Sequence, residues 1–241
     1  CKENNTVPRT ALRVNRLKAT RDGAVASLAA EGIAAEKARW SEDGLYLAGS
    51  AAGLRETAAF RNGWIRVQDE ASQLVSRLAA PEPGERLLDL CAGAGGKTLH
   101  LAALMGDRGE ITAVDLHPDK LRLLEAEAVR LGVTIATIHA GDAAALPESF
   151  GSAFDRVLLD APCSGLGTLR RNPEIRWRIT QADLEASGAL QKRLVDGAAG
   201  CVKPGGRLVY CVCTITPEEN ESAVEHLLAA REFGRTGVVG G

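Results

Sequence analysis

The stretch Arg-Leu-Leu-Asp-Leu-Cys-Ala-Gly-Ala-Gly-Gly-Lys-Thr, from Arg86 to Thr98, decides the fold of this chain. Its first part, Arg86–Cys91, is an apolar run typical of a buried strand, and Lys97–Met105 has the apolar spacing of a helix. Glycines between the two permit positive φ angles and let a ligand approach the backbone closely. The helix start adds free N–H groups for a polar or anionic ligand. The stretch therefore predicts a strand, a ligand-binding turn and a helix.

Strands and helices alternate along the chain after this turn. We expect strands at Ile111–Asp115, Thr134–Ala140, Arg156–Asp160 and Arg207–Cys213, and helices at Pro118–Leu131, Ala182–Gly200 and Glu218–Ala230. Each strand is continuously apolar, as in a parallel sheet that helices cover on both faces. Ligands of such α/β sheets bind outside the carboxyl ends of the strands, so side chains that follow the strands are candidates for function.

The chain before Pro81 is organised differently. It contains short strands at Ala11–Asn15 and Gly44–Ala48, a helix at Gly23–Ala30 and an amphipathic helix at Gln68–Ala80. The residues expected on the buried face of that last helix are Ala71, Leu74, Val75 and Leu78. Pro81–Gly84 is a stiff, turn-forming linker. These patterns predict a small α+β module over residues 1–66, a connecting helix and linker over 67–84, and an α/β domain over 85–241.

Composition excludes several classes of protein. The chain has 241 residues, a net charge of −2 and 45% apolar residues, which is ordinary for a globular protein. No apolar run reaches the roughly 20 residues of a membrane span, and Cys1–Asn5 is polar, unlike a signal peptide. The six cysteines lack zinc-site spacing, so we expect no metal, and reduced cysteines fit a cytoplasmic protein. The opening without Met suggests that the sequence is a fragment.

Basic side chains gather in two segments, residues 1–21 and residues 170–178, although the net charge is close to zero. Local basic patches can bind phosphates even in an acidic protein, whereas either cluster alone is more typical of a solvated surface. Together they predict a track for nucleic acid, and the candidate contacts are Arg13, Arg16, Lys18, Arg170, Arg171 and Arg176. Trp177 lies in the second segment and is expected in the core, with stacking on a base as the alternative.

Acidic side chains follow three strands of the predicted sheet. Asp115 ends one strand, Asp142 follows the next, and Asp160 ends another. Carboxyl ends of parallel strands meet at one edge, so we expect these acids beside the glycine-rich turn, with Asp115 on the hydroxyls of a ribose and Asp142 on an adenine amino group. A helix cap is the alternative for each acid alone. A nicotinamide-dinucleotide fold is the alternative for the site, but Thr98 occupies its third glycine position.

Two cysteines are expected at the same edge. Cys163 lies three residues beyond one strand end, and Cys213 ends another strand. Cys201 and Cys211 have the pattern of small buried hydrophobic residues instead. A thiolate at such an edge is available for covalent catalysis, so Cys163 and Cys213 are the candidate reacting groups, with Asp160 as an acid beside them.

Three motifs carry a resemblance to a known family. They are Cys91–Thr98, Asp160-Ala161-Pro162-Cys163-Ser164-Gly165 and Pro217-Glu218-Glu219-Asn220, with weaker matches at Arg13–Asn15 and Val67–Gln73. From about Ala11 to Glu221 the chain resembles the Sun/Nop-type RNA 5-methylcytosine methyltransferases, most closely the bacterial members that act on 16S ribosomal RNA. The resemblance implies the Rossmann-like sheet of S-adenosyl-L-methionine methyltransferases, with the amino-terminal α+β module as an RNA-binding appendage.

The resemblance also implies roles for the residues at the sheet edge. The cofactor S-adenosyl-L-methionine would be bound by Cys91, Ala92, Gly93, Ala94, Gly95, Gly96, Lys97, Asp115, Asp142 and Asp160. Cys213 matches the family's nucleophile, and Cys163 matches the position linked to product release. Carbon 5 of cytosine becomes nucleophilic only after a thiolate adds to carbon 6, and a base must then remove the carbon 5 proton. Asp160 would share a proton with the ring nitrogen.

The sequence departs from the family pattern at several points. Gly93-Ala94 stands where Ala-Pro is commoner, and Val212-Cys213-Thr214 replaces Thr-Cys-Ser. The all-helical amino-terminal domain of the bacterial enzyme and the final strand pair of the sheet have no counterpart, as in a trimmed chain.

Other functions remain open at this point. The alternatives are transfer RNA as the acceptor, a DNA cytosine methyltransferase with Cys163 as its nucleophile, and an inert RNA-binding scaffold. The scaffold is disfavoured because all three acids and both cysteines are present. We expect RNA, most plausibly ribosomal, as the partner, with no membrane and no obligate protein partner.

Overall fold

Five parallel strands form the central sheet in the part of the chain that the structure, a computed structural model, describes: residues 2–146, 150–230 and 233–234. The strands are β5 (Arg86–Leu90), β6 (Glu110–Asp115), β7 (Ala136–Ala140), β8 (Phe154–Asp160) and β9 (Val202–Cys211). Their order is β7-β6-β5-β8-β9, so the strand order reverses at β5. The crevice at the carboxyl end of β5 is therefore the ligand position of an open α/β sheet, and the predicted Rossmann-like fold is confirmed.

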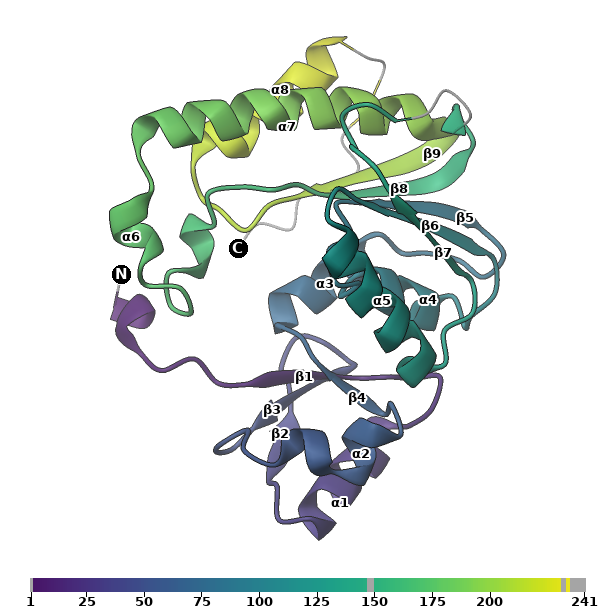
Figure 1. The fold of residues 1–241 in the computed structure, drawn as a ribbon, viewed down its shortest axis with the longest axis vertical. Coiled ribbons are helices and arrows are strands. Elements are labelled where there is room, and N and C mark those ends of the chain that lie inside the picture. The colour runs from purple at the N-terminus through teal and green to yellow at the C-terminus, as the bar shows by residue number, and fades with distance from the viewer. Residues whose placement is uncertain (1, 147–149, 231–232, 235–241) are drawn as a thin grey trace.

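Helices cover both faces of this sheet (Figure 1). One face carries α3 (Glu70–Leu78), α4 (Thr98–Leu104) and α5 (Pro118–Leu131), and the other carries α7 (Gln181–Cys201) and α8 (Glu221–Ala230). Side chains alternate along β5, so Leu88 and Leu90 join the cluster under α7 and α8 while Leu87 joins the cluster under α4 and α5. The apolar strands are thus buried on both sides.

Local chemistry sets the ends of the longer helices. Pro118 begins α5, and Gly132, with a φ of 74°, ends it in the left-handed conformation. Thr180 and Asp183 form a capping box at the start of α7.

No described helix is long and apolar enough to span a bilayer.

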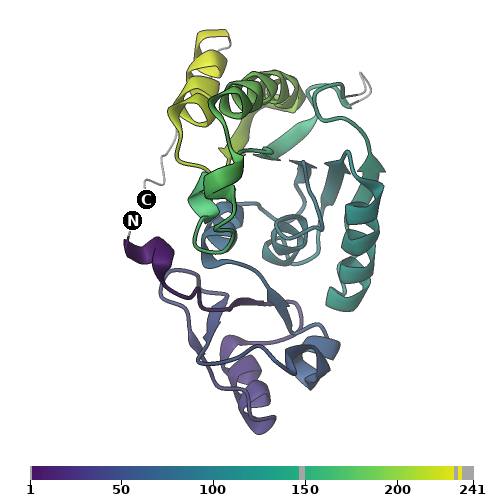
Figure 2. The same cartoon turned by 60° about the vertical axis from the view of Figure 1, so that its left-hand side comes forward.

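An antiparallel sheet forms the amino-terminal module, which Figure 2 shows below the larger sheet. Its strands are β1 (Ala11–Val14), β2 (Ala35–Lys37), β3 (Gly44–Leu47) and β4 (Ile65–Val67), in the order β2-β3-β1-β4, with α1 (Arg21–Ala30) and α2 (Ala58–Arg61) packed on them. Leu12, Leu45 and Ile65 are fully buried in its core. The sequence did not predict β2, β4 or α2, because three or four residues carry little periodic signal.

Short helical turns complete the chain. They are η1 (Lys2–Asn5), η2 (Leu54–Glu56), η4 (Leu166–Thr168), α6 (Ile175–Arg178) and η5 (Pro217–Glu219). Both η4 and α6 lie between β8 and α7, and η5 precedes α8. The last residues of the predicted α/β domain, 235–241, lie outside the described residues.

Helix α3 connects the two sheets and buries a polar face instead of the predicted apolar one. Glu70 and Gln73 are buried, whereas Leu78, on the predicted face, is 38% exposed. Gln73 Nε2 donates to the carbonyl of Leu12 at 3.2 Å, and Glu70 accepts from the backbone N–H groups of residues 40–41. Val75 of the predicted face does pack against the apolar core. The rest of that face was wrong because the neighbour of α3 offers hydrogen-bonding groups, which apolar spacing does not reveal.

Candidate active site

The glycine-rich turn joins β5 to α4 at the carboxyl edge of the sheet. Cys91, Gly93 and Gly95 have φ angles of 61°, 57° and 77°, in the left-handed region that side chains rarely tolerate. A Cβ atom on Gly95 would lie 2.5 Å from Cγ of Leu124 in α5, so no larger residue fits there. Burial, reinforced by nearby carboxylates, raises the pKa of Cys91 to about 12, which makes this thiol a poor nucleophile.

Two arginines of the amino-terminal module hold this turn. Arg13 of β1 donates from Nη1 to the carbonyl of Gly96 at 2.7 Å, and Arg66 of β4 donates from Nη2 to the carbonyl of Ala94 at 2.6 Å. Arg13 is 1% exposed, and burial lowers the pKa of its guanidinium to about 9. The prediction that Arg13 contacts RNA is therefore wrong, because its charged group does not reach the surface. The sequence did not indicate Arg66 as a contact of the turn, because it did not predict strand β4, which carries this residue.

Asp115 and Asp142 lie beside the turn in different environments. Asp115, which ends β6, accepts a hydrogen bond from the N–H of Gly93 at 2.8 Å and is 5% exposed. Its carbonyl accepts from the N–H of Gly141 at 3.0 Å, which places the loop after β7 next to it. Asp142 in that loop is exposed and accepts from the N–H of Ala144 at 2.8 Å. The structure thus brings the turn and both predicted acids to one edge.

Asp160, at the end of β8, is held between a lysine and a cysteine. Lys97 of the turn forms an ion pair with its Oδ2, and Cys211 at the end of β9 donates from Sγ to its Oδ1 at 3.2 Å. Burial disfavours the charged form of Lys97, but the carboxylate of Asp160 outweighs burial and raises the pKa of the lysine. Burial and Asp160 also raise the pKa of Cys211, which keeps its thiol protonated. Cys211 is therefore a polar partner of Asp160 and not the plain core residue predicted, whereas Cys201 is buried at 4% exposure.

The two cysteines predicted at the edge face each other. Their Sγ atoms are 3.3 Å apart, although β9 ends at Cys211 and Cys213 lies in the loop beyond it. The N–H of Cys213 also donates to Cys163 Sγ at 3.3 Å. The hydrogen bond from Cys163 lowers the pKa of Cys213 to about 7, while the same contact and burial raise the pKa of Cys163. Cys213 is also the more exposed of the two, and its lowered pKa makes it the thiol that ionises first as the pH rises.

Arg170 and Arg171 bind the amino-terminal segment of the chain. Arg170 donates to the carbonyls of Thr6 and Val7, and Arg171 donates to the carbonyl of Arg9 at 3.1 Å. Arg171 also forms an ion pair with Asp69. The two basic segments therefore meet, as the predicted track requires, but both guanidinium groups already have partners in the protein.

The other predicted basic contacts are more open to solvent. Arg16 is 47% exposed and lies 4.0 Å from Asp43, and Lys18 Nζ donates to the carbonyl of Arg130 at 2.8 Å. The guanidinium of Arg176 lies 5.8 Å from the ring centroid of Trp177. Trp177 is 77% exposed, so the expectation that it lies in the core is wrong. It belongs to the single-turn helix α6, which stands away from the sheet (Figure 1).

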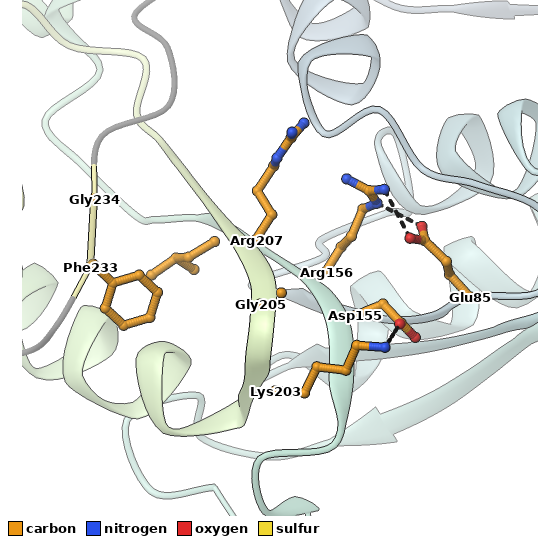
Figure 3. A pocket seen from close by; sticks show the side chains of 10 residues that line it. Glu85, Asp155, Arg156, Lys203, Gly205, Arg207, Phe233 and Gly234 are labelled. Carbon is orange, nitrogen blue, oxygen red and sulfur yellow. Dashed lines mark hydrogen bonds and ion pairs between the residues drawn. The ribbon is translucent and has the colours of Figure 1, made fainter.

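A cavity of about 380 Å³ lies at the opposite edge of the sheet, at the amino ends of β8 and β9 (Figure 3). Four of its charged side chains form pairs, Arg156 with Glu85 at 2.6 Å and Lys203 with Asp155. The fifth, Arg207, donates to the carbonyl of Leu78 at 3.4 Å. None of the predicted site residues lines it. Because open α/β sheets bind ligands at the carboxyl ends of their strands, we place the candidate site at the other edge.

Comparison with known proteins assigns the chain to a family. The family model described as 16S rRNA methyltransferase RsmB/F matches residues 76–237, and that of an RsmF/B-like, ferredoxin-like domain matches residues 1–52. The chain belongs to the RsmB/F family of methyltransferases. The resemblance inferred from its motifs is thereby confirmed.

Two relatives and two solved structures illustrate the RsmB/F match. The probable ribosomal RNA small subunit methyltransferase B of Synechocystis is 41% identical over 98% of this chain and 53% of its own length. The 28S rRNA (cytosine-C(5))-methyltransferase of mouse is 38% identical over 95% of this chain and 30% of its own length. The chain thus spans about half the length of the bacterial relative.

The solved structures are both from Pyrococcus horikoshii. A methyltransferase homolog has a TM-score of 0.84 and 31% identity over 98% of this chain and 77% of its own. NSun6, determined with SFG, has a TM-score of 0.86 over 95% of this chain and 82% of its own, and at 24% identity it shows the fold alone.

Proposed function

We propose that the chain transfers a methyl group from S-adenosyl-L-methionine to carbon 5 of a cytosine in RNA, through a covalent adduct with Cys213. The observation that carries this proposal is the pair of sulfur atoms 3.3 Å apart at the edge that holds Asp160. A thiol with a pKa of about 7 is about half ionised at neutral pH, and a protonated thiol beside it supplies a proton-transfer group. The relatives are named as methyltransferases of ribosomal RNA, which supports RNA as the substrate class and 16S ribosomal RNA as the first acceptor to test.

The residues around the glycine-rich turn fit S-adenosyl-L-methionine. Asp115 offers a carboxylate for ribose hydroxyls, and the exposed carboxylate of Asp142 suits an adenine amino group. Residues 91–97 provide a strained backbone turn for close approach, and Lys97 connects that turn to Asp160. When bound, the cofactor supplies the methyl group as an electrophile.

Three residues of this chain have roles in the proposed reaction. The thiolate of Cys213 adds to carbon 6, and the new carbon–sulfur bond raises the electron density of carbon 5, which takes the methyl group. Asp160, fixed by Lys97 and Cys211, shares a proton with the ring nitrogen as the ring charge changes. A base then removes the carbon 5 proton, the bond to carbon 6 breaks, and Cys213 leaves as a thiolate. We assign assistance of that release to Cys163, whose sulfur lies 3.3 Å from that of Cys213.

The surface near the cysteines fits single-stranded RNA. Trp177 offers an exposed aromatic face on which a base can stack, and Arg176 beside it offers a positive charge for a phosphate. We assign phosphate contacts to Arg16, Lys18 and Arg176. Arg170 and Arg171 instead hold the loop against the amino terminus, which keeps the module next to the cysteines.

The test supplies the protein with radiolabelled S-adenosyl-L-methionine and three acceptors: 16S ribosomal RNA, transfer RNA and DNA. We expect label in the ribosomal RNA, and bisulfite mapping is expected to place it on carbon 5 of a cytosine. Label in transfer RNA or in DNA, and not in ribosomal RNA, would show that the labelled nucleic acid is the methyl acceptor and that ribosomal RNA is not. Cofactor binding in a calorimeter without transfer to any acceptor would favour the RNA-binding scaffold.

A further inference from the structure

Glu219 in η5 carries a buried carboxylate that accepts four hydrogen bonds. The residue is 0% exposed. Its Oε1 accepts from the N–H of Ser164 at 2.8 Å and from Gln191 Nε2 at 3.2 Å. Its Oε2 accepts from the hydroxyl of Ser164 and from that of Thr216 at 3.0 Å. A buried carboxylate is tolerated only where its acceptor sites are filled, and here three separate segments of the chain fill them.

These donors reach both segments that carry the reacting cysteines. Ser164 directly follows Cys163, and the hydroxyl of Thr214, which directly follows Cys213, lies 2.9 Å from that of Ser164. Gln191 of α7 donates to the carbonyl of Pro162 at 2.9 Å as well as to Glu219. The residues on both sides of Cys163 are therefore fixed by the network around Glu219.

The loop of Cys213 is fixed by backbone contacts to the same region. The N–H of Gly167 donates to the carbonyl of Cys213 at 2.9 Å, and a Cβ atom on Gly167 would lie 2.9 Å from that oxygen. Asn220, next to Glu219, donates to the carbonyl of Thr214 at 3.2 Å. Cys213 itself is exposed, so its position depends on these neighbours rather than on burial of its side chain.

We infer that Glu219 is a positioning residue that sets the distance and orientation between the sulfur atoms of Cys163 and Cys213. The catalytic consequence of this inference rests on the proposed function, whereas its geometric consequence does not. Burial alone would raise the pKa of Glu219, but the hydrogen bonds from Ser164 and Thr216 outweigh burial and lower it. The carboxylate is therefore ionised at neutral pH, and ionised acceptors form stronger hydrogen bonds than neutral ones.

Loss of this charge weakens all four hydrogen bonds together and lets one cysteine loop shift against the other. The pKa of Cys213 is lowered mainly by its hydrogen bond from Cys163, while burial and Asp160 oppose that effect and Lys97 assists it. Greater separation of the two sulfur atoms removes the main effect, so the pKa of Cys213 rises toward the ordinary value of a thiol. A misplacement on the order of 1 Å reduces a catalysed rate roughly a hundredfold.

The test compares Glu219→Gln with Glu218→Gln. Glu218 is the adjacent acid, half-buried, and its carboxylate forms no hydrogen bond within the described residues. Alkylation of Cys213 by iodoacetamide is followed by mass spectrometry as a function of pH. We expect a midpoint near pH 7 in the wild type and in Glu218→Gln, and a midpoint about one unit higher in Glu219→Gln. The kcat of methyl transfer is expected to fall roughly a hundredfold in Glu219→Gln, with cofactor affinity unchanged.

An unchanged alkylation midpoint in Glu219→Gln overturns the inference, even if kcat falls, because a merely structural residue would lower activity without moving that midpoint. If Glu219→Gln fails to bind cofactor and is unfolded, Ser164→Ala decides, since it removes one hydroxyl and keeps the N–H bond. A smaller upward shift in Ser164→Ala supports the inference, and no shift overturns it. Alkylation needs neither RNA nor cofactor, so a wild-type protein without methyl transfer contradicts the proposed function alone.

Discussion

Cys163 and Cys213 place their sulfur atoms 3.3 Å apart although fifty positions separate them in the sequence. They follow β8 and β9, which are neighbours in the sheet and run parallel, so the loops beyond both strands leave the same edge. The thiols differ in environment, because Cys213 is exposed and has a pKa lowered to about 7, whereas Cys163 has a raised pKa. This asymmetry supports our proposal that Cys213 is the nucleophile.

Replacement of Cys213 by alanine is expected to abolish methyl transfer. Without the thiolate, carbon 5 is not activated, so the loss in kcat is expected to reach roughly a thousandfold or more. Binding of S-adenosyl-L-methionine, measured by calorimetry, should persist. The control is Cys201→Ala, which removes a thiol buried in the core far from the edge and should retain activity. Near wild-type activity in Cys213→Ala would show that Cys213 is not the nucleophile. Cys163 would then be the candidate, as in the alternative of a DNA cytosine methyltransferase.

Methyl transfer is expected to rise with pH through neutrality. The reacting form of Cys213 is deprotonated, and its pKa of about 7 means that the thiolate fraction grows up to that pH and levels off above it. The kcat/KM of the wild type should therefore increase tenfold per unit of pH below the midpoint and reach a plateau above it. A rate that falls with rising pH over this interval would show that a protonated group, and not a thiolate, limits the reaction.

Replacement of Cys163 by alanine is expected to trap the RNA on the protein. Addition of Cys213 to carbon 6 needs only the thiolate, whereas release of the product needs a group that assists removal of the carbon 5 proton. Loss of the hydrogen bond from Cys163 raises the pKa of Cys213, so the assay is run above the ordinary pKa of a thiol, about 8.5, where the thiolate still forms. There we expect a protein–RNA band that survives denaturation in Cys163→Ala and disappears in the Cys163→Ala, Cys213→Ala double variant. Absence of the band in Cys163→Ala would show that Cys163 does not assist release of the methylated RNA.

The sheet and its functional edge were predictable from the sequence because their signals are local. Continuously apolar strands show the parallel sheet, and the acids and cysteines that follow those strands show which edge is functional. Arg13 was misjudged for the opposite reason, since its partner Gly96 lies 83 positions away and no local pattern links them. Glu219 belongs to a motif that the sequence displays, yet its role appears only where Ser164, Gln191 and Thr216 meet around it.

Replacement of Trp177 by alanine is expected to weaken RNA binding without changing cofactor affinity. Stacking of a base on an exposed aromatic ring contributes about 1–3 kcal/mol, which corresponds to a loss in affinity of roughly 5-fold to 150-fold. The dependence of affinity on salt should stay the same in Trp177→Ala and become shallower in Arg176→Ala, because only the arginine displaces a counterion. Val129→Ala, at an 81% exposed position on α5, is the control. Equal RNA affinities in Trp177→Ala, Arg176→Ala and Val129→Ala would show that α6 is a solvated turn without a role in RNA binding.

Replacement of Arg13 by methionine separates the two roles considered for this residue. Arg13 is 1% exposed and donates to the carbonyl of Gly96, so its loss removes a contact to the glycine-rich turn and leaves a partly buried carbonyl without its donor. An unpaired buried acceptor is unfavourable by about 1–3 kcal/mol, but removing a buried guanidinium offsets part of that penalty. We therefore expect a small change in the free energy of unfolding and a roughly tenfold loss in affinity for S-adenosyl-L-methionine, about 1.4 kcal/mol. The control is Arg9→Met, at an exposed position paired with Glu36, which should leave cofactor affinity unchanged. Weaker RNA binding with unchanged cofactor affinity in Arg13→Met would contradict this assignment and restore the RNA contact.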